Sequence, residues 1–511
     1  MPQSDNKRIA KNTVYLYIRM IIVMAVTFYT ARVVLNVLGF QDYGIYNLVG
    51  GVVVLFAFLN NSMTGCTQRY LCVSIGKKDQ IYEAKVFTCS VISHIIISIL
   101  FLVLAETVGL WFIIDVLNIP QESKTSAIIV YQIALLTTLF NIFKVPFNAA
   151  IIAHERMNFY AISSIIEAAL NLTILIPLVY ISSNKLILYS SLISAVSFFI
   201  LLWYLFYTYK HFPNCRFRPE YLKKSLIKEM LKFTGWSNFS SIANLSAKQG
   251  MNFIFNIFYG VIINASVGIM QQVNSAVYSF INNFQVAINP PIIKLYTNSE
   301  WDNLKKLYIR AAKYSFFLML LLSFPLILNI NPILKLWLKD VPEYTGWFCA
   351  LSLISLLPNT IGGPIWTIIQ ASGNLSKYQI IISSLILFNL PLDYLLLYWG
   401  MPPYILLIVT LIINSLVILI GIKFVSRCSP ITQSDSILKI IIPCAITAGV
   451  ALLVGYIINL NFDEFNGNLL NLFFKILFEV FSIILIIFLL GLKRSERSQV
   501  KRLIFSHIKF K

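Results

Sequence analysis

The chain has 511 residues, of which 58% are hydrophobic and only 12% are charged. Soluble domains usually carry about 25% charged residues, and here apolar runs of roughly 20 residues recur from one end to the other. These properties exclude a soluble globular protein and predict an all-α polytopic membrane protein. The formal charge of +19 could suit a nucleic acid, but the basic residues gather in loops, so no nucleic-acid partner is expected.

About fourteen transmembrane helices are predicted, each close to the roughly 20 residues that a bilayer requires or longer. In chain order they cover residues 13–38, 45–72, 84–113, 123–153, 158–181, 186–209, 233–260, 264–297, 306–337, 344–371, 377–399, 403–426, 437–460 and 468–492.

The loops between these spans differ in charge from side to side. Most of the 40 Lys and Arg residues lie in the N-terminus, in every second loop and in the C-terminal tail. The opposite side carries only Lys124, Lys185, Lys335 and Lys339. By the positive-inside rule, both termini are predicted to be cytoplasmic.

The longest connection, "YKHFPNCRFRPEYLKKSLIKEMLKF" (209–233), is basic and predicts a cytoplasmic linker that lies on anionic lipid. The halves on either side resemble each other, for example in "FLNN" (58–61) and "FINN" (280–283). Six spans per half give both halves the same orientation, an architecture typical of transporters with a substrate site between the halves. The predicted parts are a first lobe (1–210), the linker (211–232), a second lobe (233–428), two further helices (429–492) and a basic cytoplasmic tail (493–511).

The span 233–260 carries Lys248 in its middle, and the next span is rich in amides. A charge at the bilayer centre costs roughly 2.5–3.5 kcal/mol on insertion scales, and neither span contains an acidic residue to neutralise it. The polar stripes therefore favour a water-filled cavity over the alternative of hydrogen bonds within a tight helix bundle. The predicted cavity residues are Lys248, Asn244, Asn252, Gln271, Asn274 and Asn282.

Four further charges lie within predicted spans. Arg19 and Arg32, near the two ends of the first span, either face the cavity or extend to lipid head groups. Lys144 and Glu167 lie at similar depth on consecutive spans. They form either a buried ion pair or a coupling site in which Glu167 carries a proton or another ion.

The sequence contains no P-loop, no H-E-x-x-H and no G-x-S-x-G, so no catalytic residues are assigned and an enzyme is not expected. The seven cysteines include no C-x-x-C. They are expected to be free thiols, with no metal site and no cofactor.

The opening "NTVYLYIRMIIVMAVTFYTARVVLNVLGFQDYGIYNLVGGVVVLF" (12–56), with the repeat and the two further helices, resembles a known family. It resembles the Wzx-type O-antigen flippases, the polysaccharide branch of the multidrug/oligosaccharidyl-lipid/polysaccharide (MOP) exporter superfamily. "LGFQDYGIYNL" is the most specific piece. The resemblance implies a MATE-like, V-shaped pair of six-helix lobes in the bacterial inner membrane. It also implies alternating-access transfer of an undecaprenyl-pyrophosphate-linked oligosaccharide, an O-antigen or capsule repeat unit.

For such a substrate, Lys248 would hold the pyrophosphate while the amides line the glycan path. The implied partners are this lipid-linked oligosaccharide, anionic membrane lipids, a coupling ion such as H⁺ or Na⁺, and the polysaccharide polymerase machinery. Three alternatives stay open. A lipid II flippase has the same layout, a multidrug or cation antiporter should line its cavity with carboxylates, and a membrane polysaccharide polymerase should need a larger outer loop.

Overall fold

The computed structural model describes the backbone of residues 3–56, 63, 66–68, 70–72, 74–75, 79–154, 156–181, 184–372, 376–461, 469–492 and 496–498. Throughout these residues the regular structure is helical and no strand occurs, which confirms the predicted all-α class. Eleven of the helices are long and apolar enough to cross a membrane, as expected for a polytopic membrane protein.

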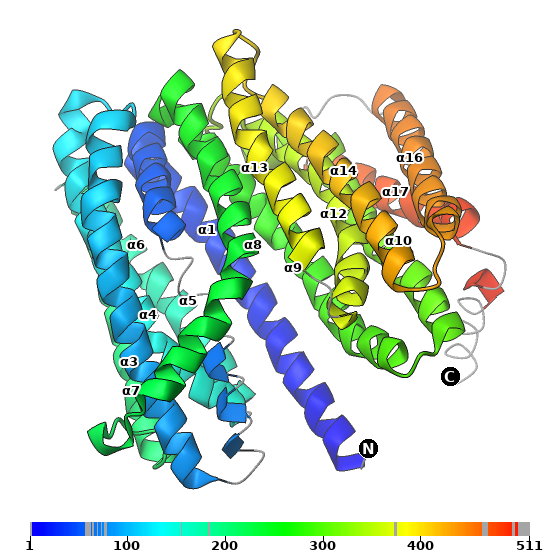
Figure 1. Cartoon of the computed structure of the whole chain (residues 1–511). Helices are drawn as coiled ribbons and strands as arrows, with labels where there is room; N and C mark the ends of the chain where they lie inside the picture. Colours follow the sequence, from blue (N-terminus) through cyan, green and yellow to red (C-terminus); the bar gives the residue numbers. More distant parts are fainter. Residues whose placement is uncertain are drawn as a thin grey trace. The chain divides into compact units, whose positions relative to one another are not determined.

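The chain forms two compact units, Met1–Gly268 and Ile269–Lys511 (Figure 1). The helices of the first unit are α1 (Gln3–Phe56), α3 (Gln80–Leu104), α4 (Gln121–Ala153), α5 (Met157–Thr173), α6 (Leu175–Tyr180), α7 (Lys185–His211) and α8 (Lys224–Tyr259). Two π-helical turns, Ala105–Gly109 and Phe112–Val116, extend α3, and a 3₁₀ turn, Pro219–Tyr221, precedes α8.

Helix α9 (Val261–Thr297) begins in the first unit and continues into the second. The remaining helices of the second unit are α10 (Trp301–Leu328), α11 (Ile330–Leu338), α12 (Thr345–Ala371), α13 (Ser376–Tyr398), α14 (Ile405–Cys428), α15 (Gln433–Ser436), α16 (Ile442–Asn461) and α17 (Leu469–Ile486). Two more π-helical turns, Ile437–Ile441 and Ile487–Gly491, lie before α16 and after α17.

The boundary between the two units differs from the one expected at the linker. Helix α8 packs on α1 and α3 within the first unit, although the sequence repeat groups this helix with the second half. Helices α16 and α17 pack on α10 within the second unit. The two helices outside the repeat therefore join the core of the second unit.

Helices α8 and α9 have 36 and 37 residues and are long enough to span a bilayer. Both contain several amides, and α8 also carries Lys248, which lowers their mean hydropathy. The two helices assigned to the cavity are thus more polar than most of their neighbours.

A glycine breaks the helix at the same place in each half. In α1 the break is at Gly39 (φ 78°, ψ 174°), between the first two predicted spans. Between α8 and α9 it is at Gly260 (φ 74°, ψ −168°). Glycine adopts positive φ without the steric penalty that a Cβ brings. The shared break supports the internal repeat that "FLNN" and "FINN" indicate.

The second part of α1 lies very close to the start of α9. A Cβ atom on Gly44 would overlap the backbone carbonyl of Val261, and one on Gly268 would lie 2.7 Å from the amide atoms of Asn47. Gly39 and Gly44 both belong to "LGFQDYGIYNL". One glycine permits the break and the other permits the close packing, which gives this stretch a structural reason for its composition.

Replacing Gly44 with alanine is expected to destabilise the protein by about 1–3 kcal/mol, the usual effect of overpacking, because the obstructing atoms belong to the backbone of Val261. Gly50→Ala is the matched control, since nothing lies within 4 Å of the position that its Cβ would occupy. Thermal unfolding in detergent should show a lower Tm for Gly44→Ala only. Equal Tm values for the two variants would contradict this packing.

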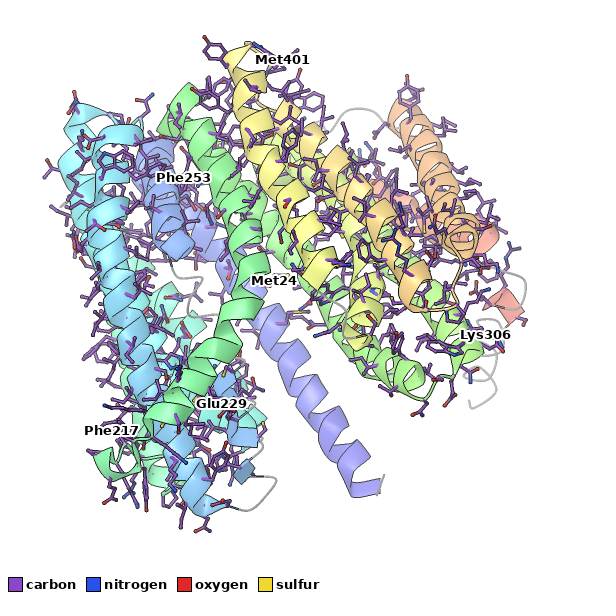
Figure 2. All side chains as sticks on the ribbon, in the orientation of Figure 1. Met24, Phe217, Glu229, Phe253, Lys306 and Met401 are labelled. Atoms are coloured by element: carbon purple, nitrogen blue, oxygen red, sulfur yellow. The ribbon has the colours of Figure 1, made fainter. Side chains whose placement is uncertain are left out.

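Aromatic side chains hold the core of the first unit together. Phe253 of α8 packs edge-on against Phe112, with the ring centroids 5.0 Å apart, and Figure 2 places Phe253 on α8. The buried hydroxyl of Tyr131 donates to the carbonyl of Ala105 at 2.7 Å, at the first residue of a π-helical turn. The same carbonyl also accepts the backbone N–H of Leu110, the regular bond of the π-helical turn, so the tyrosine adds a second hydrogen bond that joins α4 to this turn.

A buried ion pair attaches the chain after α17 to the core of the second unit. Lys313 of α10 donates to Glu496 at 3.0 Å, and the two side chains are only 1% and 4% exposed. The guanidinium of Arg310 lies 3.9 Å from the other carboxylate oxygen of Glu496. The predicted basic tail therefore contains a residue that is buried against a membrane-spanning helix.

Candidate functional site

The side chain of Lys248 is exposed on α8. The sequence has no Asp or Glu between Glu229 and Glu300, and no described carboxylate lies within ion-pair distance of the Lys248 ammonium. Its ammonium group therefore has no acidic partner among the residues that the structure describes.

The face of α8 next to Lys248 packs against α1. A Cβ on Gly51 would lie 2.7 Å from Oε1 of Gln249 and 3.2 Å from Nδ2 of Asn252, so glycine lets the two helices approach with amides between them. Lys248 lies beside this contact and remains accessible within the first unit.

Asn252 does not line an open path, contrary to the expectation. It is 2% exposed, and Asn264 of α9 donates to both its side-chain oxygen (2.6 Å) and its backbone carbonyl (2.8 Å). Asn256 donates to Asn264 and to the carbonyl of Asn118, whose N–H donates back to Asn256 at 2.8 Å. This amide cluster joins α8, α9 and the segment after α3, so for Asn252 the hydrogen-bonded bundle was the correct alternative.

Asn274 is also engaged in helix packing, in the second unit. Its side-chain oxygen accepts a 3.0 Å hydrogen bond from Ser352 of α12. Further along α9, Gln285 donates to the carbonyl of Thr360 at 2.8 Å, and Asn289 accepts from Thr367 at 2.8 Å. The amides on this face of α9 thus help to attach α12.

The other predicted cavity residues vary in accessibility. Asn282 is exposed, whereas Gln271 and Arg32 are partly buried. The side chains of Arg19 and Asn244 lie outside the described residues. For these five residues a place in the cavity stays a prediction.

Lys144 and Glu167 do not form the ion pair that the sequence suggested. No carboxylate of the described residues lies within ion-pair distance of Lys144, and its ammonium lies 5.8 Å from the centre of the Tyr204 ring. The aromatic face of α7 takes the place of the carboxylate. Glu167 is half-buried, and its role in ion coupling stays a prediction.

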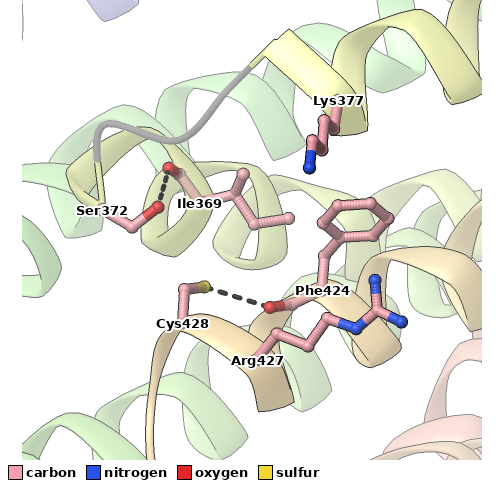
Figure 3. A pocket seen from close by; sticks show the side chains of 6 residues that line it. All are labelled: Ile369, Ser372, Lys377, Phe424, Arg427 and Cys428. Carbon is pink, nitrogen blue, oxygen red and sulfur yellow. Dashed lines mark hydrogen bonds between the residues drawn. The ribbon is translucent and has the colours of Figure 1, made fainter.

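A cavity that the sequence did not indicate lies in the second unit, where α12 and α14 end and α13 begins (Figure 3). It has a volume of about 210 Å³, and its lining includes the cations Lys377 and Arg427. The Ser372 hydroxyl and the Cys428 thiol donate to the carbonyls of Ile369 and Phe424. Lys377 is the first residue of one predicted span and Arg427 directly follows another, and charge alone gave no sign that they share a cavity.

No family model and no curated protein matches the sequence. Solved structures do match, over most of their length. A multidrug resistance transporter of the MATE family in an inward-facing conformation aligns with a TM-score of 0.66 and 15% identity, covering 82% of this chain and 98% of its own. The lipid II flippase MurJ in an inward closed conformation aligns with a TM-score of 0.65 and 14% identity, covering 93% and 98%.

A transporter from Pyrococcus furiosus, described as having a binding pocket of reverse polarity, aligns with a TM-score of 0.60 and 16% identity, covering 84% of this chain and 96% of its own. Two of the three structures are described as transporters of the MOP superfamily, and the third is described as a lipid II flippase. Identities this low establish the fold and leave the substrate open. The protein therefore has the fold of the MOP-superfamily transporters.

Proposed function

We propose that the protein is a flippase that moves an undecaprenyl-pyrophosphate-linked oligosaccharide, such as an O-antigen or capsule repeat unit, across the bacterial inner membrane by alternating access. The exposed ammonium of Lys248, on a helix pair without carboxylates from residue 230 to residue 299, carries the proposal. A pyrophosphate offers several anionic oxygens to such a donor, and hydrogen bonds between charged groups are roughly twice as strong as neutral ones.

The charge of this region argues against a transporter of cationic drugs. A cationic drug is best neutralised by carboxylates at its binding site, whereas α8 and α9 have none from residue 230 to residue 299 and carry the ammonium of Lys248. The Pyrococcus furiosus neighbour is described as one whose reversed pocket polarity suggests a different function. This description supports using the sign of the pocket charge to distinguish substrates within the fold.

Lipid II is the second candidate substrate, and one observation favours it. MurJ is matched over 93% of this chain, against 82% for the MATE transporter. Because lipid II and the proposed substrate are both lipid-linked and anionic, Lys248 alone does not distinguish them.

The test is a flipping assay in proteoliposomes. Three substrates are compared in the same vesicles: a fluorescent undecaprenyl-pyrophosphate oligosaccharide, fluorescent lipid II, and a quaternary ammonium drug. We expect rapid flipping of the oligosaccharide lipid, slower flipping of lipid II and no drug uptake. Preferential flipping of lipid II would select the second candidate, and drug uptake alone would overturn the proposal.

A further inference from the structure

Three side chains that bind metals meet at one end of the first unit. Glu83 lies in the first turn of α3, His154 directly follows α4, and Cys215 lies in the basic linker after α7. Nε2 of His154 is 3.2 Å from Oε1 of Glu83, and Sγ of Cys215 is 3.4 Å from the same oxygen. One ligand atom from each residue lies within 4.8 Å of the other two.

The surroundings fix the orientation of the imidazole. Nδ1 of His154 lies 2.9 Å from the carbonyl of Ala150, so Nδ1 carries the hydrogen of this bond and Nε2 faces the other two side chains. The ring of Phe212 stacks on the imidazole, with 4.0 Å between the centroids. Metal-binding histidines usually donate their other ring N–H to a carbonyl or carboxylate in this way.

The second oxygen of the Glu83 carboxylate also has a hydrogen-bond partner. Asn214 donates to Oε2 of Glu83 at 3.1 Å, which leaves Oε1 directed at His154 and Cys215. Glu83 and Cys215 are both buried. His154 and Glu83 thus each have one polar atom that is held by a partner and another that points toward the proposed metal position, as a preformed site requires.

We propose that Glu83, His154 and Cys215 bind a divalent transition-metal ion of the zinc type. Thiolate sulfur, imidazole nitrogen and carboxylate oxygen are the three ligand classes that zinc uses in proteins. Around a tetrahedral ion with ligand distances of about 2.0–2.3 Å, neighbouring ligand atoms lie roughly 3.3–3.7 Å apart. The two separations of 3.2 and 3.4 Å are close to this range, so little rearrangement is needed, and a water molecule completes the fourth position.

Without a metal the same residues form a hydrogen-bonded group. The Cys215 thiol donates a hydrogen bond to Oε1 of Glu83 at 3.4 Å. A metal ion takes the place of the thiol proton, because the thiolate is the form that binds metals.

The proposed ion would fasten the linker to the helix ends. Cys215 is the ligand from the linker, and the nearby backbone N–H of Arg218 already donates to Thr88 of α3 at 3.3 Å. Figure 2 marks the same stretch of chain at Phe217. The proposal does not depend on which substrate the protein carries.

The experiment uses the full chain with an affinity tag that lacks histidine, stripped with a chelator and titrated with Co²⁺ and Zn²⁺. We expect one equivalent of Co²⁺ to give a thiolate-to-cobalt absorption band in the wild type. The band should disappear in Cys215→Ser and persist in Cys89→Ser. Cys89 is the matched control because it is buried in the same unit and its thiol contacts the carbonyl of Lys223, outside the cluster.

His154→Gln keeps the thiol and tests the site without altering a cysteine. Its Zn²⁺ affinity, measured by calorimetry, should fall at least about 10-fold, since even partners that only orient metal ligands are worth 10- to 100-fold. A wild type without the thiolate band, a band that persists in Cys215→Ser, or an unchanged affinity in His154→Gln would each overturn the proposal.

Discussion

Replacing Lys248 with alanine is expected to reduce flipping of the oligosaccharide lipid about 10- to 100-fold in proteoliposomes. A hydrogen bond to a charged group contributes about 1.5–3 kcal/mol, and each 1.4 kcal/mol corresponds to a factor of ten. The side chain is exposed, so the variant should fold as the wild type does. The initial rate of flipping and the melting temperature are measured on the same preparation.

Two controls separate charge at this position from charge in general. Lys248→Arg keeps the cation and should retain most of the activity. Lys306→Ala removes an exposed positive charge at the start of α10 (Figure 2) and should flip at the wild-type rate. If Lys248→Ala flips normally, the head group binds elsewhere, and Arg32 becomes the next residue to test.

Removal of the Glu496 carboxylate should cause the largest loss of stability. Lys313 is only 1% exposed. The Glu496→Ala variant leaves its buried ammonium without a carboxylate partner among the described residues. Breaking a buried pair by removing one partner typically costs about 3–5 kcal/mol. We expect a marked decrease in Tm in detergent, together with faster proteolysis of the chain after α17.

The double variant Lys313→Met, Glu496→Leu should recover much of this loss, because apolar side chains of similar volume often replace a buried pair without penalty. A less buried pair provides the comparison. Lys305 and Asp435, which are 34% and 12% exposed, lie 2.6 Å apart. Because Asp435 keeps Lys439 as a second partner, removal of Lys305 should cost only about 0–1 kcal/mol. Equal losses of stability in Glu496→Ala and Lys305→Ala would show that burial of the Lys313–Glu496 pair does not increase its contribution to stability.

The membrane class and the helical fold could be predicted because a bilayer leaves a spanning chain few choices. Backbone groups in lipid must bond within their own helix, so apolar runs of sufficient length identify most helices. The glycine break at Gly39 was anticipated as a turn between two spans, and the structure adds the positive φ that requires glycine there.

The fate of individual polar residues could not be predicted in the same way. Helical periodicity places Lys248 and Asn252 on one face, yet Lys248 is exposed while Asn252 is bonded to Asn264. The difference depends on which atoms of another helix come within 3 Å, and no periodicity contains this information. The partner of Lys144 was missed for the same reason, since a Tyr204 ring and a carboxylate are equally compatible with the pattern.

The cluster of Glu83, His154 and Cys215 was missed because the expectation of no metal site rested on the absence of closely spaced cysteines. One signal could have found it. All three residues fall at the basic end of the predicted spans or in the basic linker, and residues from separate loops on one side of a membrane can meet. Cysteine spacing can reveal metal ligands that lie within one loop, but it gives no information on ligands that come from three separate loops.

The amide cluster of Asn252, Asn256 and Asn264 affects how this part of the chain enters the membrane during its synthesis. An unsatisfied amide in lipid costs several kcal/mol, but these partners are only 8 and 12 residues apart. The helical hairpin of α8 and α9 can thus satisfy its amides as soon as it leaves the ribosome and enters the membrane. The partners of Gln285, Ser315 and Thr360, follow 30 and 75 residues later, so the amides at the two ends of α9 are satisfied at different stages of synthesis.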